Sequence, residues 1–243
     1  MIVPALGLVV LAGAIVLGAT GFGFGLLSLP LLSLLYDPHE AVVMSLLFAF
    51  VILLIMLLRA EERRCIRYSL VLPLFGFSLV GLPLGVYVLT SVNTQQLRIM
   101  VSVLVLAFSL INLVGISRPL QRSVPVLALV GFVSGFLSTS TSLSGAPVAL
   151  FAAGAQMPKS DFRASMAAYG FLSIGLSLVL LAIAGAVSTE TLRLSATLLP
   201  ILLLGYWLGA SVFRRLSSPG FNRLVLVVIA GTGAASLLTT LRY

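Results

Sequence analysis

Two long stretches of the chain carry no charged residue and no histidine, and each is interrupted near its middle by small residues. Met1 to Tyr36 and Ser123 to Pro158 each span 36 residues. A continuous helix of that length would measure roughly 54 Å, against a hydrocarbon core of about 30 Å in a bilayer. Neither stretch is therefore suited to a single straight span.

The two interruptions lie at matching positions. The first reads GATGFGFGLLSLP from Gly18 to Pro30, and the second reads GFLSTSTSLSGAP from Gly135 to Pro147. Their first residues are 117 positions apart, and so are their last. Interrupted apolar segments at corresponding places in two halves are typical of secondary transporters, whose binding sites they form.

The rest of the chain also indicates a membrane protein. Hydrophobic residues make up 60% of its 243 residues and charged residues only 8%, which a water-soluble domain could not sustain. Six further apolar runs are at least 18 residues long, enough for helical spans. They are Ala41 to Leu58, Tyr68 to Leu97, Ile99 to Ser117, Ala164 to Thr189, Leu194 to Phe213 and Leu224 to Leu241. We expect an all-α polytopic membrane protein.

Basic residues are scattered between these runs, so membrane orientation explains the net charge of +8 better than nucleic-acid binding does. If each uncharged stretch crosses once, eight lysines and arginines face one side and six the other. If each stretch returns to the side it came from, the division is eleven against three, with Arg98, Arg193 and Arg242 in the minority. The positive-inside rule favours the returning arrangement, with Asp37 to Glu40 outside and Arg59 to Arg67 in the cytoplasm.

This arrangement predicts two repeats of inverted topology within one integral membrane domain. Residues 1–117 and 123–243 are the repeats, and residues 118–122 form a cytoplasmic linker. Each repeat begins with an interrupted helical hairpin, 1–36 or 123–158, and continues with three transmembrane helices. Whether the hairpins are re-entrant or fully spanning stays open. At an offset of 124, two glycine pairs also recur, Gly81/Gly205 and Gly85/Gly209, which predicts close helix packing.

The interruptions are suited to binding an anion. New helices are expected to begin near Ser28 and Ser144, with Pro30 and Pro147 in their first turns, and a helix N-terminus offers free N–H groups and partial positive charge. Glycines allow close approach of the main chain, and hydroxyls add donors. The predicted substrate-binding residues are Thr20, Gly21, Phe22, Gly23, Phe24, Gly25, Ser28, Ser138, Thr139, Ser140, Thr141, Ser142, Ser144 and Gly145.

Two alternatives stay open for these interruptions. They can serve only as kinks with tight packing, in which serine and threonine bond back to their own helices. The carbonyl ends of the preceding helices can also attract a cation such as sodium.

Four charged or titratable residues are candidates for a gate or for coupling. Asp37, His39 and Glu40 follow the first stretch and are the titratable set beside it, although they need no function if they form a solvated turn after Pro38. Arg163 opens the span after the second stretch. It either binds anions at the inner mouth or anchors the helix, paired with Asp161.

These residues resemble the sulfite exporter TauE/SafE family of membrane transporters, whose members look like duplicated small proteins with a glycine-rich segment leading to a proline in each half. The matching motifs are Gly21-Phe-Gly-Phe-Gly25 with Pro30, Gly131-Phe-Val-Ser-Gly135 with Gly145-Ala-Pro147, and Phe162-Arg-Ala-Ser165. The resemblance implies movement of sulfite, organosulfonates or related anions across the bacterial inner membrane. Ser138 to Ser142 departs from a Gly-Gly-rich pattern, which leaves the individual substrate open.

We therefore expect a secondary transporter, working as an exporter, of small sulfur-containing anions, with the lipid bilayer as its setting and no metal or cofactor. An anion channel and a transporter of small carboxylates are the alternatives. A membrane-embedded enzyme is disfavoured because the sequence lacks buried catalytic acids and a Cys/His constellation. Coupling to protons or sodium, and assembly as a homodimer, are compatible with this prediction.

Overall fold

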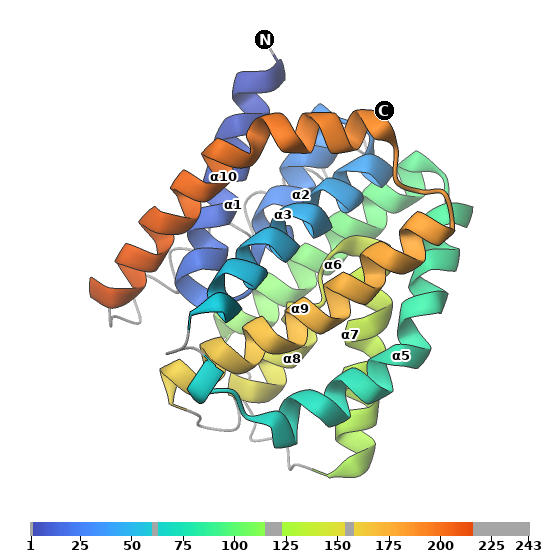
Figure 1. Ribbon diagram of the computed structural model, residues 1–243. Coiled ribbons are helices and arrows are strands. Elements are labelled where there is room, and N and C mark those ends of the chain that lie inside the picture. Colours follow the sequence, from blue (N-terminus) through green and yellow to red (C-terminus); the bar gives the residue numbers. More distant parts are fainter. Residues whose placement is uncertain (1, 60–62, 115–122, 154–157, 216–243) are drawn as a thin grey trace.

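The computed structural model describes residues 2–59, 63–114, 123–153 and 158–215, and these residues form α-helices without a strand (Figure 1). The helices are α1 (Ile2–Thr20), α2 (Phe24–Leu35), α3 (Pro38–Leu58), α5 (Tyr68–Ser91), α6 (Thr94–Val114), α7 (Val124–Thr141), α8 (Gly145–Ala153), α9 (Lys159–Ile183) and α10 (Thr189–Arg215). The expected all-α class is confirmed. The linker 118–122 and the last apolar run, Leu224 to Leu241, lie outside the described residues.

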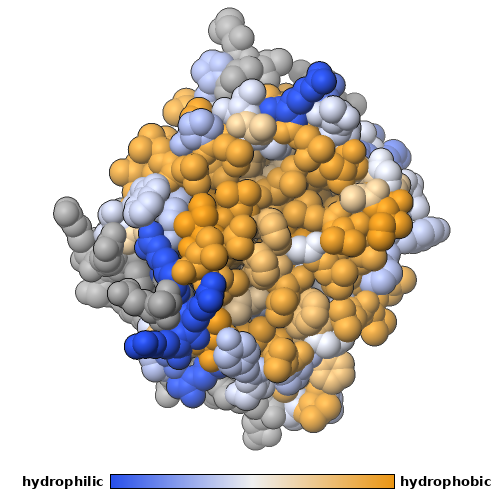
Figure 2. All heavy atoms as spheres, in the orientation of Figure 1, coloured by the Kyte–Doolittle hydropathy of each residue, from blue (hydrophilic) through white to orange (hydrophobic). Residues whose placement is uncertain are grey.

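Six of these helices are long and apolar enough to cross a membrane: α3, α5, α6, α7, α9 and α10. Figure 2 shows hydrophobic residues over the middle of the visible face, with hydrophilic residues gathered near its edges. Such a surface suits contact with lipid in the middle and with water or headgroups at the rims. The structure therefore confirms a multi-pass helical membrane protein.

Each uncharged stretch forms two helices separated by a short break. Residues 21–23 separate α1 from α2, and residues 142–144 separate α7 from α8. Gly21 and Gly23 have φ angles of 81° and 92°, a left-handed conformation that glycine adopts without strain. Gly13 of α1 faces Phe24 and Ser28 of α2 with no room for a side chain, so these helices pack against each other.

The first of the two expected helix starts is wrong. α2 begins at Phe24 rather than near Ser28, so Pro30 lies inside the helix and not in its first turn. The two left-handed glycines complete the turn by residue 23, which lets the helix begin directly afterwards. α8 begins at Gly145, so the start expected near Ser144, with Pro147 in the first turn, is confirmed.

Side-chain contacts show which loops lie at the same end of the molecule. At one end, Arg67 before α5 forms an ion pair with Asp161 of α9, with 2.7 Å between Nε and Oδ2. At the other end, the hydroxyl of Ser188 before α10 donates to Glu40 of α3 at 3.2 Å. Single crossings of the uncharged stretches would put Arg67 and Asp161 on opposite sides. The contacts therefore agree with the arrangement in which each stretch returns.

Two helix pairs pack in a corresponding way, α5 against α7 and α10 against α1. Gly81 and Gly85 of α5 contact the main chain of α7, and Gly205 and Gly209 of α10 contact the main chain of α1. A Cβ atom at any of these positions would collide with a main-chain atom of the neighbour, so the expected close packing is confirmed. The inverted relation of the complete repeats stays a prediction, because the final span lies outside the described residues.

Cys65, the only cysteine of the chain, tests the orientation of the fold. It lies partly exposed in the loop between α3 and α5, among the arginines assigned to the cytoplasm. A membrane-impermeant maleimide should leave Cys65 unlabelled in intact cells and label it in inverted membrane vesicles. In a Cys65→Ser background, Asn93→Cys at the opposite end should show the reverse. Labelling of Cys65 from outside would contradict the orientation.

Candidate functional site

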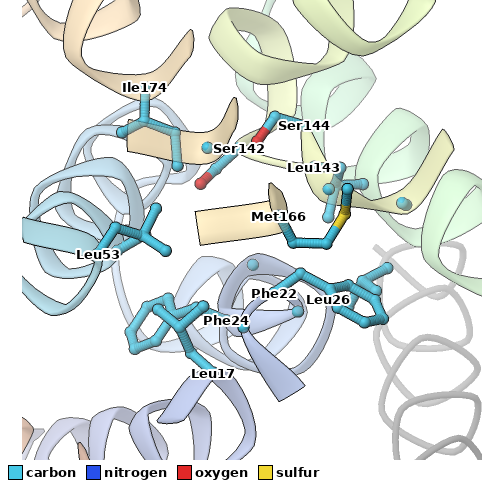
Figure 3. Close-up of a pocket in the computed structure, with 17 residues that line it drawn as sticks. Leu17, Phe22, Phe24, Leu26, Leu53, Ser142, Leu143, Ser144, Met166 and Ile174 are labelled. Atoms are coloured by element: carbon cyan, nitrogen blue, oxygen red, sulfur yellow. The ribbon is translucent and has the colours of Figure 1, made fainter. Parts of the chain in front are cut away.

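The two breaks meet at one small, partly open cavity with a volume of about 30 Å³. None of its 17 lining residues is charged. The lining residues are Leu17, Gly21, Phe22, Gly23, Phe24, Gly25, Leu26, Ala49, Leu53, Ser142, Leu143, Ser144, Gly145, Ala146, Met166, Gly170 and Ile174. Figure 3 shows Ser142 and Ser144 on the opposite side of the cavity from Leu17 and Phe24.

The N-termini of α2 and α8 both line this cavity. The first N–H groups of a helix have no acceptor within it, and α2 has no side-chain cap at its N-cap residue, Gly23. In α2 the first helical hydrogen bond comes from the N–H of Leu27 to the carbonyl of Gly23. The main-chain N–H groups of Phe24, Gly25 and Leu26 thus have no acceptor within the helix, and these three buried residues line the cavity.

Two carbonyls near the end of α1, on the other side of the first break, accept hydrogen bonds from protein groups. Arg163 of α9 is only 5% exposed, and its Nη2 donates to the carbonyl oxygen of Gly18 at 2.9 Å. The N–H of Gly21 bonds to the carbonyl of Leu17 at 2.8 Å. A cation at a helix C-terminus neutralises the partial negative charge there. The Arg163 guanidinium therefore supplies positive charge at the end of α1, next to the first break.

The carbonyl end of α7 is closed in a different way, by a turn of its own chain. Ser142 is the only non-glycine among the described residues with a positive φ, at 55°. This left-handed residue lets its own N–H bond to the carbonyl of Ser138 at 3.0 Å and the N–H of Leu143 bond to that of Leu137 at 3.1 Å. The hydroxyl of Ser142 is buried, lines the cavity and has no hydrogen-bond partner among the described residues.

The structure brings together most of the predicted site residues from both halves. Gly21 to Gly25 from the first break, and Ser142, Ser144 and Gly145 from the second, all line the cavity. Gly25 lies against the main chain of Ser142, where an added Cβ atom would be 2.5 Å from the carbonyl oxygen. The two breaks are thus in direct contact, and binding of a substrate by these residues stays a proposal.

The remaining predicted residues lie outside the cavity lining. The hydroxyl of Thr20 lies 2.9 Å from the carbonyl oxygen of Val16 and 2.6 Å from that of Phe22, which closes the end of α1. Ser28 is buried and faces Gly13. The hydroxyls of Ser138 to Thr141 contact Ser177, Leu82, Phe136 and Leu137, respectively, within the helix packing.

The apolar half of the lining was not predicted from the sequence. It includes Ala49 and Leu53 of α3, and Met166, Gly170 and Ile174 of α9. The three α9 residues share one helix face with Arg163, which lies against Gly21. Their helical spacing from Arg163 was the only sequence feature that could have indicated them. Nothing in an ordinary apolar helix, however, distinguishes a cavity wall from a packing surface.

The outer candidates lie away from the cavity, because the 12 residues of α2 separate Asp37 from the first break by about 18 Å. Nδ1 of His39 lies 3.3 Å from a carboxylate oxygen of Asp37, and Nε2 lies 3.0 Å from the carbonyl oxygen of Val92. Burial raises the pKa of Tyr36, and so do hydrogen bonds and charge from Glu40 and Glu190. A role of this cluster in coupling stays a prediction.

The fold and the cavity together define a class, that of polytopic helical membrane proteins with a cavity between two interrupted segments, as in secondary transporters. A family model, sulfite exporter TauE/SafE, matches residues 5–236 of the chain. The chain therefore belongs to the TauE/SafE sulfite exporter family, whose members are transporters of small sulfur anions in the lipid bilayer. No curated protein and no solved structure matches it.

Replacement of Arg163 tests its function as a cap of α1. We expect Arg163→Gln to lower the unfolding free energy by about 2 kcal/mol or more, because it removes a buried, charged hydrogen-bond donor. Arg67→Gln is the matched control, since the Arg67 side chain is 52% exposed and its ion pair contributes at most about 1 kcal/mol. Thermal unfolding of purified protein in one detergent measures both, and equal losses would contradict the assignment.

Proposed function

We propose that the protein is a secondary transporter that exports small sulfur-containing anions, such as sulfite or organosulfonates, across the bacterial inner membrane. The substrate binds in the cavity between the two breaks, against Gly21 to Gly25 from one half and Ser142, Ser144 and Gly145 from the other. Relative motion of the two halves then opens this cavity to either side in turn.

One observation carries this proposal: the N-termini of two helices, one from each half, line the same cavity together with the buried, unpartnered hydroxyl of Ser142. Helix N-termini and hydroxyl groups both donate hydrogen bonds, and the helix dipoles add partial positive charge. An oxyanion presents several acceptor oxygens in a small volume. The donors and the acceptors are therefore complementary.

The other ends of the breaks support an anion over a cation. Arg163 binds the carbonyl of Gly18 at the end of α1, and the N–H groups of Ser142 and Leu143 bond to carbonyls at the end of α7. These are the groups that would otherwise coordinate a cation such as sodium. Protein donors thus already occupy these carbonyls, whereas the helix N-termini at the cavity offer N–H groups, which favours an anion.

A neutral site also fits the needs of transport. Conduction and transport require binding that is favourable enough for a substrate to enter and weak enough for it to leave. A charged lysine or arginine in the cavity wall would form a stronger, charge-assisted pair with the anion. Main-chain N–H groups and hydroxyls instead recognise the anion without a full opposite charge, which favours its release.

The Ser142→Gly variant tests this site. Glycine suits the left-handed backbone at residue 142, and the change removes only the small CH2OH side chain, so the unfolding temperature without ligand should not fall. The Kd for sulfite should rise about tenfold, as expected for the loss of one hydrogen bond to a charged group. Binding is measured by thermal shift and by isothermal calorimetry on purified protein.

Ser195→Ala provides the control for this experiment. The hydroxyl of Ser195 is also buried and unpartnered among the described residues, but it lies on α10 outside the cavity lining, so its loss should leave the Kd unchanged. Wild-type protein should be tested in parallel with sulfite, thiosulfate, sulfoacetate, taurine and matched carboxylates. Binding of carboxylates alone would overturn the sulfur assignment, and an unchanged Kd in Ser142→Gly would overturn the site.

A further inference from the structure

A chain of hydroxyl groups connects α9 to the second break. The hydroxyl of Tyr169 on α9 donates to Oγ of Ser134 on α7 at 2.7 Å, and the hydroxyl of Ser134 donates to the carbonyl oxygen of Ser144. All three residues are buried, with exposures of 1%, 0% and 3%. Each hydroxyl thus has a defined direction of donation, and successive bonds in such a chain strengthen one another.

These two hydrogen bonds, from Tyr169 to Ser134 and from Ser134 to Ser144, fix the orientation of one peptide group at the cavity. The peptide between Ser144 and Gly145 is planar and trans, so its carbonyl and its N–H point in opposite directions. Ser134 holds the carbonyl toward α7, and the N–H of Gly145 therefore points away from α7. Gly145 begins α8 and lines the cavity, and its N–H has no acceptor within that helix.

We propose that Ser134 and Tyr169 are positioning residues for substrate recognition: they turn the Ser144 carbonyl out of the cavity and present the N–H of Gly145 to a bound anion. The proposal rests on the function proposed above, because it assumes an anionic substrate in this cavity. Neither side chain lines the cavity. Both act through the peptide group that they hold.

Without these hydroxyls, the Ser144 carbonyl loses its partner in buried surroundings. An unpaired carbonyl inside the membrane is costly. Rotation of the peptide group toward another donor, or toward water in the cavity, therefore becomes favourable. A carbonyl that faces the cavity repels an anion. The direct consequence is therefore weaker anion binding rather than a loss of the fold.

The test uses Ser134→Ala, Tyr169→Phe and the double variant. Ser134→Ala should raise the Kd for sulfite about fivefold or more, since it removes the direct bond to the carbonyl. Tyr169→Phe should have a smaller effect, because its hydroxyl reaches the carbonyl through Ser134 and does not bond to it directly. The double variant should bind no more weakly than Ser134→Ala alone, because Tyr169 acts through Ser134.

Ser177→Ala is the matched control. Its hydroxyl lies 2.8 Å from that of Ser138, so it also joins α9 to α7 in buried surroundings, but it holds no carbonyl at the break. We expect a wild-type Kd for this variant. A Kd that rises equally in Ser177→Ala and Ser134→Ala would show a general packing effect and overturn the proposal, and so would a wild-type Kd in Ser134→Ala.

Hydrogen exchange without any ligand separates this proposal from the proposed function. Amides in the segment 142–146 should exchange faster in Ser134→Ala and Tyr169→Phe than in the wild type and in Ser177→Ala. Unchanged exchange would overturn the positioning role, whatever the wild-type protein binds. A wild type that binds none of the anions would instead overturn the proposed function, while faster exchange would still show that the hydroxyls hold this peptide.

Discussion

A main-chain group that leaves a helix inside the bilayer finds no water, and this constraint governs the arrangement around both breaks. Each break creates a helix end with unbonded carbonyls and a helix start with unbonded N–H groups. Protein donors bond to carbonyls at both helix ends: Arg163 and Gly21 bond to carbonyls of α1, and the N–H groups of Ser142 and Leu143 bond to carbonyls of α7. The N–H groups instead face a shared cavity. This asymmetry supports the proposed preference of the site for an anion.

Helix α9 connects the two breaks to each other. Arg163 contacts the end of α1, Tyr169 reaches the second break through Ser134, and Met166 and Gly170 between them line the cavity. Helix α9 therefore contacts both breaks. If the halves move relative to each other as proposed, a movement of α9 would change both breaks at once.

Much of this architecture could be predicted from the sequence, because it follows from charge and length. The absence of charge over 36 residues predicted the broken segments. The arginine distribution predicted that each segment returns to its own side, and the ion pair between Arg67 and Asp161 is consistent with that prediction. The serine run could not be assigned in this way. Hydroxyls of Ser138 to Thr141 look the same in sequence as that of Ser142, and only the packing decides which of them faces the cavity. The helix start near Ser28 was also wrong, because two left-handed glycines close the turn earlier.

The central claim is that an oxyanion binds where the two helix N-termini meet. Selenite resembles sulfite and contains an anomalous scatterer, so diffraction from crystals grown with selenite locates the anion directly. We expect an anomalous peak between the start of α2 and the second break, within hydrogen-bond distance of Ser142. A peak elsewhere, such as beside His39 at the outer end, or a cavity without one at saturating selenite, would contradict it.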